Sequence, residues 1–168
     1  MLLAGVAATL CATGCLTRPG YAVKTYRMGD RIELGKLVYN VYETQWHPQF
    51  GTGPAGRVPQ NRFLLIRVNI TNSGQADIIV PNFVVINDNA KEFPELSNGD
   101  QVPQWVGLLR SVKPADSLQG NLVFDCTAGH YKLRITDETE QKTALVDLPL
   151  TFSSETPEIP SPELPQKQ

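Results

Sequence analysis

The sequence predicts an all-β protein, folded as an antiparallel sandwich of about seven or more short strands. Thirteen prolines and thirteen glycines divide the 168 residues into short segments, and no segment has the length and period of a long helix. Within these segments, apolar residues recur at every second position, the spacing of a strand with one buried face. Short strands separated by turns are typical of two sheets packed face to face.

Residues 63–74 form the clearest predicted strand, and the other elements are placed relative to it. Apolar residues occupy every second position from Leu64 to Ile70, polar residues occupy the alternate positions from Arg67 onward, and Asn72-Ser73-Gly74 ends the run as a turn. One face of the strand is therefore expected to be buried. Phe63 and Leu65 interrupt the polar side at its start. We expect both faces to be covered at that end.

Two strand pieces are predicted before the central strand, at 26–35 and 36–46. Apolar residues alternate with charged ones in the first piece, and the apolar parity changes after Gly35. A period of two can change parity only through an extra residue or a bend, so we place a bulge or kink at Gly35. The second piece is expected to end at Trp46.

After the central strand, short alternating segments continue to the end of the predicted sandwich. Pro81 forces an edge or a break after the first of them. A turn with a favourably placed proline is expected at 113–116. The remaining strands are predicted at 78–80, 83–86, 118–124, 131–135 and 146–150, with a return strand starting at 92–93.

The first residues are expected to be a targeting segment rather than part of the sandwich. Residues 1–16 carry no charge and form an apolar run too short to span a bilayer comfortably. Ala-Thr-Gly-Cys at 12–15 resembles the lipobox of bacterial lipoproteins, and the resemblance implies a multiply acylated Cys15 at the mature N-terminus. A plain signal peptide cut nearby and an uncleaved hydrophobic anchor are the alternatives.

The chain is accordingly divided into four parts. We expect a lipoprotein-type signal peptide at 1–15, a tether at 16–22, the sandwich at 23–152 and a tail at 153–168. The tail is rich in proline and glutamate and contains little apolar surface to bury, so it is expected to be disordered. Without Cys11 and Cys15, Cys126 has no disulfide partner, which favours a small buried side chain over a reactive thiol.

A long loop follows the second strand piece and carries the candidate binding residues. Residues 47–61 contain three glycines and three prolines, and long loops on sandwiches often bind ligands. If the domain binds a partner, we expect exposed aromatic and arginine side chains to form the contact surface. The alternatives are a floppy connector, and tryptophans that pack as core or lid residues under their loops. The candidates are Trp46, His47, Gln49, Phe50 and Arg57 in this loop and Trp105 in another.

Several segments together carry a family resemblance. They are Gly29-Asp30 before the first strand, the central strand 63–74, the run 83–88, and residues 112–125 with a proline turn, a glycine and a Phe-Asp pair in order. These segments resemble the telokin-like DUF4352 domain of bacterial lipoproteins and secreted proteins, a family related to mycobacterial immunoprotective antigens. The resemblance covers residues 26–150. It implies an immunoglobulin-like antiparallel β-sandwich and brings no enzymatic activity and no catalytic residues.

The sequence contains no motif for catalysis, for a cofactor or for a preformed metal site. It lacks GxSxG and a glycine-rich phosphate loop, and His47 and His130 are not spaced as paired metal ligands. Both histidines are expected at the surface or in turns. The oxygen-rich turn 87–89 with Glu92 is interpreted as turn chemistry rather than a calcium site.

The function predicted from these observations is a non-catalytic binding or interaction domain of the cell envelope. Its partners are expected to be the membrane, through the lipid, and an unidentified envelope protein or extracellular ligand. A net charge of −2 and the lack of a basic run argue against nucleic acid. The protein is expected to be exported and anchored as a lipoprotein, or secreted if Cys15 is not lipidated. The alternative is an enzyme or metal carrier whose site is assembled across loops.

Overall fold

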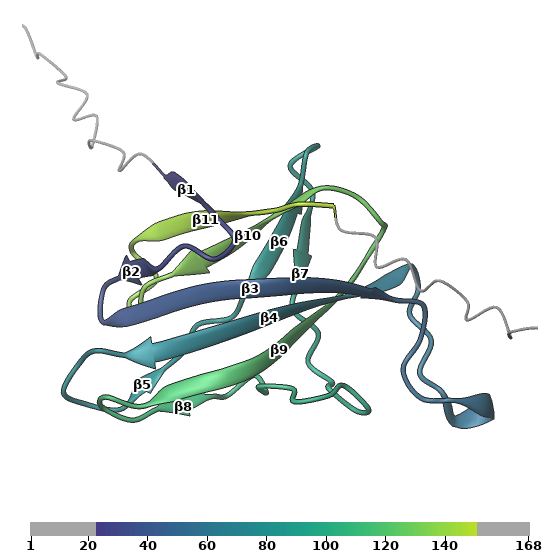
Figure 1. Ribbon diagram of the computed structural model, residues 1–168, viewed down its shortest axis with the longest axis horizontal. Helices are drawn as coiled ribbons and strands as arrows, with labels where there is room; N and C mark the ends of the chain where they lie inside the picture. The colour runs from purple at the N-terminus through teal and green to yellow at the C-terminus, as the bar shows by residue number, and fades with distance from the viewer. Residues whose placement is uncertain (1–22, 151–168) are drawn as a thin grey trace, which may run out of the picture.

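Residues 23–150, the part of the chain that this computed structural model describes, fold into two β-sheets packed face to face (Figure 1). The five-stranded sheet has the order β1-β11-β10-β6-β7 and the four-stranded sheet the order β2-β3-β4-β9, with a small ribbon of β5 and β8 beside them. The predicted β-sandwich is confirmed. The strands are β1 (Lys24–Arg27), β2 (Ile32–Leu34), β3 (Leu37–His47), β4 (Arg62–Asn72), β5 (Ile78–Ile79), β6 (Val84–Asn87), β7 (Glu92–Pro94), β8 (Ser111–Val112), β9 (Ser117–Cys126), β10 (Tyr131–Thr136) and β11 (Thr143–Leu148), with a short 3₁₀ turn η1 (Gly53–Ala55).

Several predictions concern parts of the chain outside the described residues. These are the signal peptide at 1–15 with its acylated Cys15, the tether at 16–22, and the tail at 153–168. Within residues 23–150, no helix has the length and apolar character needed to cross a bilayer.

The first predicted strand is wrong in its extent, because residues 26–35 belong to two strands in different sheets. β1 pairs with β11, and the chain then turns at Gly29, whose φ is +88°, before β2 joins the other sheet. The β1–β11 pair is parallel, so the antiparallel prediction fails at this edge. An alternating pattern does not reveal a change of sheet, because both sheets bury every second residue.

The parity change at Gly35 marks a hairpin and not the expected bulge or kink. β2 and β3 are antiparallel, and Leu34 lies directly opposite Leu37. The two residues between them make the turn, with Gly35 at a φ of +63° that favours glycine. A two-residue turn changes the apolar parity just as an inserted residue does, so the pattern alone could not separate them.

The main core lies between the sheets, and a second core lies outside the four-stranded sheet. The inward side chains of β4, from Leu64 to Ile70, are at most 1% exposed, which confirms the predicted parity. On the outer face of the same sheet, two segments outside the regular strands, 48–61 and 95–106, contribute to a second apolar cluster. Both faces of β4 are therefore covered at its start, as predicted. We call this cluster the second core; its buried members are Phe50, Phe63, Leu65, Val102 and Val123, with Leu96 and Trp105 partly buried.

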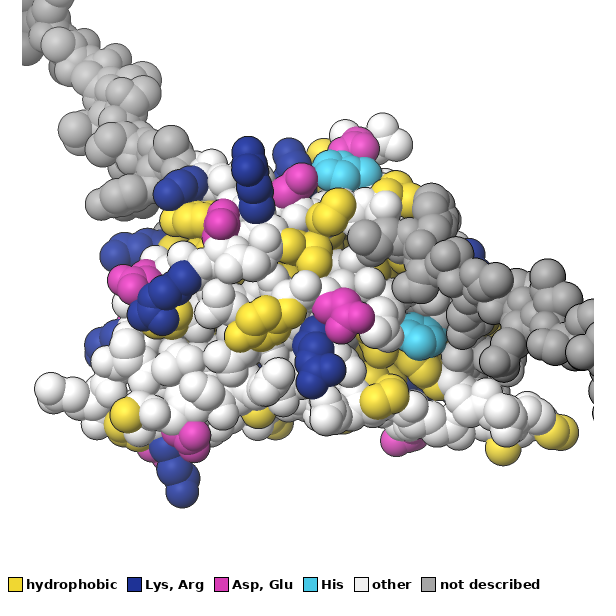
Figure 2. Space-filling view, in the orientation of Figure 1, with side chains coloured by type: hydrophobic (Ala, Val, Ile, Leu, Met, Phe, Trp, Pro, Cys, Tyr) yellow, Lys and Arg dark blue, Asp and Glu magenta, His cyan; other side chains and the backbone are white. Residues whose placement is uncertain are grey.

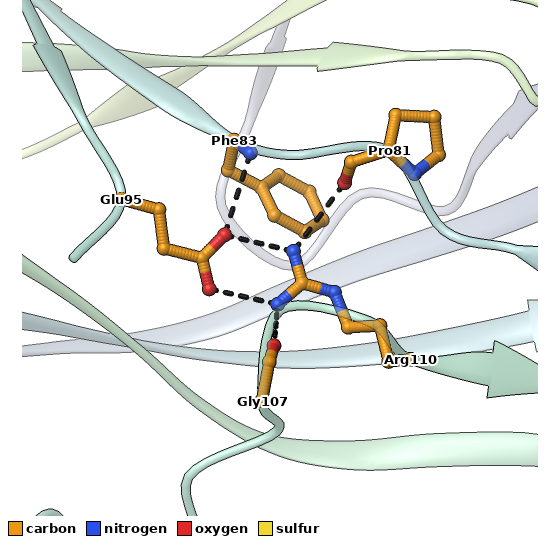
Figure 3. A network of polar contacts seen from close by, with 5 residues as sticks. All are labelled: Pro81, Phe83, Glu95, Gly107 and Arg110. Atoms are coloured by element: carbon orange, nitrogen blue, oxygen red, sulfur yellow. Dashed lines mark hydrogen bonds and ion pairs between the residues drawn. The ribbon is translucent and has the colours of Figure 1, made fainter. Parts of the chain in front are cut away.

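A buried ion pair fixes the segment that begins this outer cover (Figure 3). Two hydrogen bonds of 2.7 Å join the Arg110 guanidinium to the Glu95 carboxylate, and both side chains are at most 2% exposed. Arg110 also donates to the carbonyl oxygens of Pro81 and Gly107, and its guanidinium lies 4.9 Å from the centre of the Phe83 ring. One arginine thus holds together three segments that are distant in the sequence.

Breaking this pair should be costly, because the remaining charge would be buried without a partner. We expect Arg110→Met or Glu95→Gln to lower the free energy of unfolding by about 3–5 kcal/mol, and the double change Glu95→Leu/Arg110→Met to recover most of it. Urea unfolding monitored by tryptophan fluorescence measures both losses. The half-exposed pair of Arg134 and Glu92 is the matched control, where single changes should cost no more than about 1 kcal/mol. Equal losses of free energy of unfolding at the two ion pairs would contradict the role assigned to the buried pair.

Candidate functional site

A polar groove lies on the outer face of the four-stranded sheet, beside the second core. It has a volume of about 170 Å³. Figure 2 shows acidic, basic and histidine side chains close together over β3 and β4 on this side of the molecule. We call it the Arg67 groove; it is lined by Glu43, Gln45 and His47 of β3, Leu65 and Arg67 of β4, Asn121 of β9, and Pro103 and Gln104 of the covering segment.

A β-bulge in β3 places the three polar residues in the groove. The register with β4 shifts between Val41 and Glu43, which adds one residue to β3. Up to Val41 the odd-numbered side chains face the main core, and beyond the bulge Thr44 and Trp46 face it instead. Without the extra residue, Glu43 and the two groove residues after it would point inward.

Hydrogen bonds along β3 join its three groove residues into a chain. Gln45 donates through Nε2 to Glu43 Oε1 at 2.7 Å, and the Gln45 Oε1 lies 3.1 Å from Nε2 of His47. Because the amide nitrogen of Gln45 is used by Glu43, its oxygen accepts the hydrogen of His47 Nε2. One carboxylate oxygen of Glu43 is left without a partner along this chain.

Arg67 lies at the centre of the groove between two polar neighbours. In the register of the sheet it is directly opposite Glu43 on one side and Asn121 on the other. Within residues 23–150, the side chain of Arg67 takes part in no hydrogen bond, ion pair or ring contact. A guanidinium has five donors in a fixed plane, so these donors are available to a ligand.

The far wall of the groove is attached to the edge of β9. Asn121 donates through Nδ2 to the Pro103 carbonyl at 2.8 Å and through its backbone N–H to Gln104 at 2.9 Å. The backbone of Gln104 approaches Gly120 so closely that a Cβ at this position would clash with the Gln104 carbonyl oxygen. Glycine is therefore required where the wall lies against the edge of the strand.

The long loop 48–61 packs on the sheet and supports the other end of the groove, where the ring centroid of its Phe50 lies 5.3 Å from that of His47. The ring of Phe50 stacks on Phe63 with centroids 4.5 Å apart, and the Arg57 guanidinium lies 5.0 Å from the same ring. Arg57 also donates to the Asn98 carbonyl at 2.6 Å. The Asp125 carboxylate accepts the backbone N–H groups of residues 60 and 61 at 2.6 and 2.9 Å.

The predicted binding residues are distributed differently from the expectation of an exposed aromatic surface. Of them, only His47 lines the groove. Phe50 is 5% exposed, so the expectation that it is exposed is wrong, because the loop folds its ring onto Phe63. Trp46 faces the main core and contacts Tyr131, and Trp105 packs in the second core. The positions of Trp46 and Trp105 match the alternative in which the tryptophans pack as core or lid residues.

The other predicted residues of this surface have structural partners or lie at its edge. Arg57 covers Phe63, and the exposed Gln49 donates to the Gly51 carbonyl. The groove residues that sequence reasoning missed are Glu43, Gln45, Arg67 and Asn121. Their signal was present as polar positions in predicted strands, but their common face depends on the bulge.

His130 forms a separate charged cluster at the opposite sheet. Its Nδ1 lies 2.8 Å from Asp88 and its Nε2 lies 2.9 Å from Asp147. The hydrogen bond to Asp88 raises the pKa of His130 above its usual 6.5, and that to Asp147 adds to the effect. Burial raises the pKa of Cys126 to about 12, as expected of a buried thiol with little reactivity. Among residues 23–150, no group of three or more His, Cys, Asp or Glu side chains is placed to hold a metal ion.

A family model for a domain of unknown function, DUF4352, matches residues 26–144. The chain belongs to the DUF4352 family. This confirms the resemblance found in the sequence motifs. No curated protein matches the sequence.

Solved structures share the fold of this DUF4352 domain at low sequence identity. The yjhA protein of Bacillus subtilis is 16% identical, with a TM-score of 0.58 over 74% of this chain and 99% of its own. MPT63, a secreted protein of Mycobacterium tuberculosis, is 8% identical, with a TM-score of 0.56 over 76% of this chain and 98% of its own. The Bacillus subtilis protein ycdA, a candidate lipoprotein, is 13% identical, with a TM-score of 0.56 over 73% of this chain and 39% of its own.

The His130 cluster predicts a pH-dependent contribution to stability. Because the folded-state pKa is raised, the stabilisation is fully present below the unfolded pKa of about 6.5 and is lost as pH rises through the folded pKa. We therefore expect the difference in free energy of unfolding between the wild type and His130→Gln to be largest at about pH 6. This difference, the margin, should decrease as the pH rises further. Urea titrations at several pH values measure this margin. In the Asp88→Asn/Asp147→Asn background the pH dependence of the margin should largely vanish; a margin independent of pH in the unaltered background would refute the assignment.

Proposed function

We propose that this chain is a non-catalytic binding domain of the bacterial cell envelope, with the Arg67 groove as its ligand site. The observation that carries the proposal is the Arg67 guanidinium, which has no partner among residues 23–150 although it lies in a polar groove beside a carboxylate. Guanidinium groups form strong charge-assisted hydrogen bonds, so an available one in a concave site favours ligand binding.

The surroundings of the groove support a preformed site. Hydrogen bonds from Asn121 and the close approach at Gly120 hold one wall, and the packed loop 48–61 supports one end. A site that is ordered before binding loses less conformational entropy when the ligand enters. A rigid groove therefore retains more of its interaction energy as affinity.

The size of the groove favours a small ligand or one end of a larger one. Its volume of about 170 Å³ is below the roughly 300–1,000 Å³ of pockets that enclose drug-sized molecules. Six of the eight lining residues have polar or charged side chains, and Leu65 and Pro103 are the two apolar ones. The ligand class that fits is small and charged or strongly polar.

The envelope location is supported by the sequence before the domain and by two proteins of similar fold. The lipobox-like Ala-Thr-Gly-Cys at 12–15 precedes the domain closely. Of the similar structures, MPT63 is a secreted protein and ycdA a candidate lipoprotein. In this proposal Cys15 carries more than one acyl chain, because a single chain binds membranes only weakly.

Lipidation of Cys15 can be tested directly on protein from native-type membranes. Mass spectrometry should find an acylated cysteine at the mature N-terminus, and Cys15→Ser should move the protein out of the membrane fraction. Cys11→Ser is the matched control and should leave the protein in the membrane. A mature N-terminus elsewhere, in a chain that lacks Cys15, would exclude the lipid anchor and leave a secreted protein.

The ligand site can be tested by NMR with ¹⁵N-labelled protein and the small-molecule fraction of a bacterial cell-wall digest. We expect chemical-shift changes centred on Glu43, Arg67 and Asn121. Arg67→Gln should abolish them, whereas Arg62→Gln, on the same strand but outside the groove, should preserve them. Changes that cluster away from the groove, or none at all, would refute the proposed site.

A further inference from the structure

We infer that the Arg67 groove recognises an amino-acid head group, that is, a carboxylate and an ammonium group on one carbon atom. The inference rests on the proposed function and specifies the ligand class of the same site. The groups that carry it are Arg67, Glu43 and Asn121, which form one row across three adjacent strands.

The row places donors and acceptors side by side at the spacing of neighbouring strands. Residues directly opposite each other in an antiparallel sheet have Cβ atoms roughly 4.5–5.5 Å apart. Arg67 in the middle offers only donors, and the carboxylate of Glu43 offers only acceptors. Asn121 uses its Nδ2 on the Pro103 carbonyl, so its side-chain oxygen also remains as an acceptor.

The two charges of the row are adjacent but not neutralised by each other. Within residues 23–150, no ion pair or hydrogen bond joins Arg67 to Glu43, although they are directly opposed in the register. Gln45 holds one oxygen of Glu43 through a 2.7 Å hydrogen bond along β3. The groove therefore presents a positive and a negative group next to each other.

This arrangement discriminates among the simplest ligand classes. An anion such as phosphate would meet Arg67 favourably but would lie beside the Glu43 carboxylate, and a simple cation would meet the reverse conflict. A zwitterionic head group satisfies both charges, with its carboxylate on Arg67 and its ammonium on Glu43. Such charge-assisted contacts are the strong ones, and unpaired charges in the groove penalise other ligands.

The remaining lining indicates what the rest of the ligand can be. Leu65 of β4 and Pro103 of the wall are the apolar groups of the groove. With a volume of about 170 Å³, the site accommodates the head group with a small side chain, or a longer side chain that leaves the groove. The same chemistry is available from a free amino acid and from a head group at the end of a larger molecule.

Calorimetric titration of the full-length protein with alanine and its blocked derivatives tests the inference. We expect alanine to bind, and N-acetylalanine and alaninamide, which each lack one charge, to bind at least about ten-fold more weakly. Arg67→Gln and Glu43→Gln should each weaken alanine binding by a similar factor, while Arg62→Gln leaves it unchanged. Circular dichroism checks that each variant is folded, and the two groove variants provide independent tests.

A further ligand separates the two sources of the head group. Nε-acetyllysine carries the same head group on a long neutral side chain. If Nε-acetyllysine binds as well as alanine, the natural ligand is the end group of a larger molecule. If alanine binds and Nε-acetyllysine does not, the natural ligand is a free small amino acid. Both outcomes support the inference. Blocked derivatives that bind as well as alanine, or no binding of alanine and Nε-acetyllysine, would overturn it. If alanine fails to bind but the cell-wall fraction still causes Arg67-dependent chemical-shift changes in the groove, the proposed function stands with a different ligand. If neither result is seen, the inference and the proposed function both fail.

Discussion

The coverage of β4 on both faces is the constraint on which the rest of the domain depends. The strand pairs with β3 and β9 along its whole length, and its inner side chains are buried between the sheets. At its start, Phe63 and Leu65 on the outer face form the base of the second core. Burial of large apolar side chains contributes roughly 1.5–3 kcal/mol each, which offsets part of the entropy lost when the covering segments are ordered.

The groove is a consequence of where this outer cover stops. From Arg67 onward the outer face of β4 is polar, and the covering segment pairs with the edge of β9 at Asn121 instead of continuing over the sheet. The bulge in β3 then turns Glu43 and its polar neighbours toward the uncovered area. A single inserted residue thus decides that Trp46 stabilises the core while charged groups line a surface site.

Features set by local alternation could be predicted from the sequence, whereas features set by distant contacts could not. The parity of β4 follows from the period of the strand itself, and the burial of Phe63 follows from the apolar residues that interrupt its polar side. The Glu95–Arg110 pair joins irregular segments with no period, and the two partners of His130 lie 42 and 17 residues away. The bulge in β3 was missed because residues 43–47 have no apolar alternation strong enough to show the change of face.

The central claim is that Arg67 is held unpaired in a preformed groove and receives the charged end of a ligand. The most direct measurement is a crystal structure of the protein grown with alanine, compared with one grown without it. We expect the alanine carboxylate within hydrogen-bond distance of the Arg67 guanidinium and its ammonium beside Glu43, with the groove walls unchanged between the two crystals. An empty groove in both crystals, with Arg67 paired directly to Glu43, would contradict the claim.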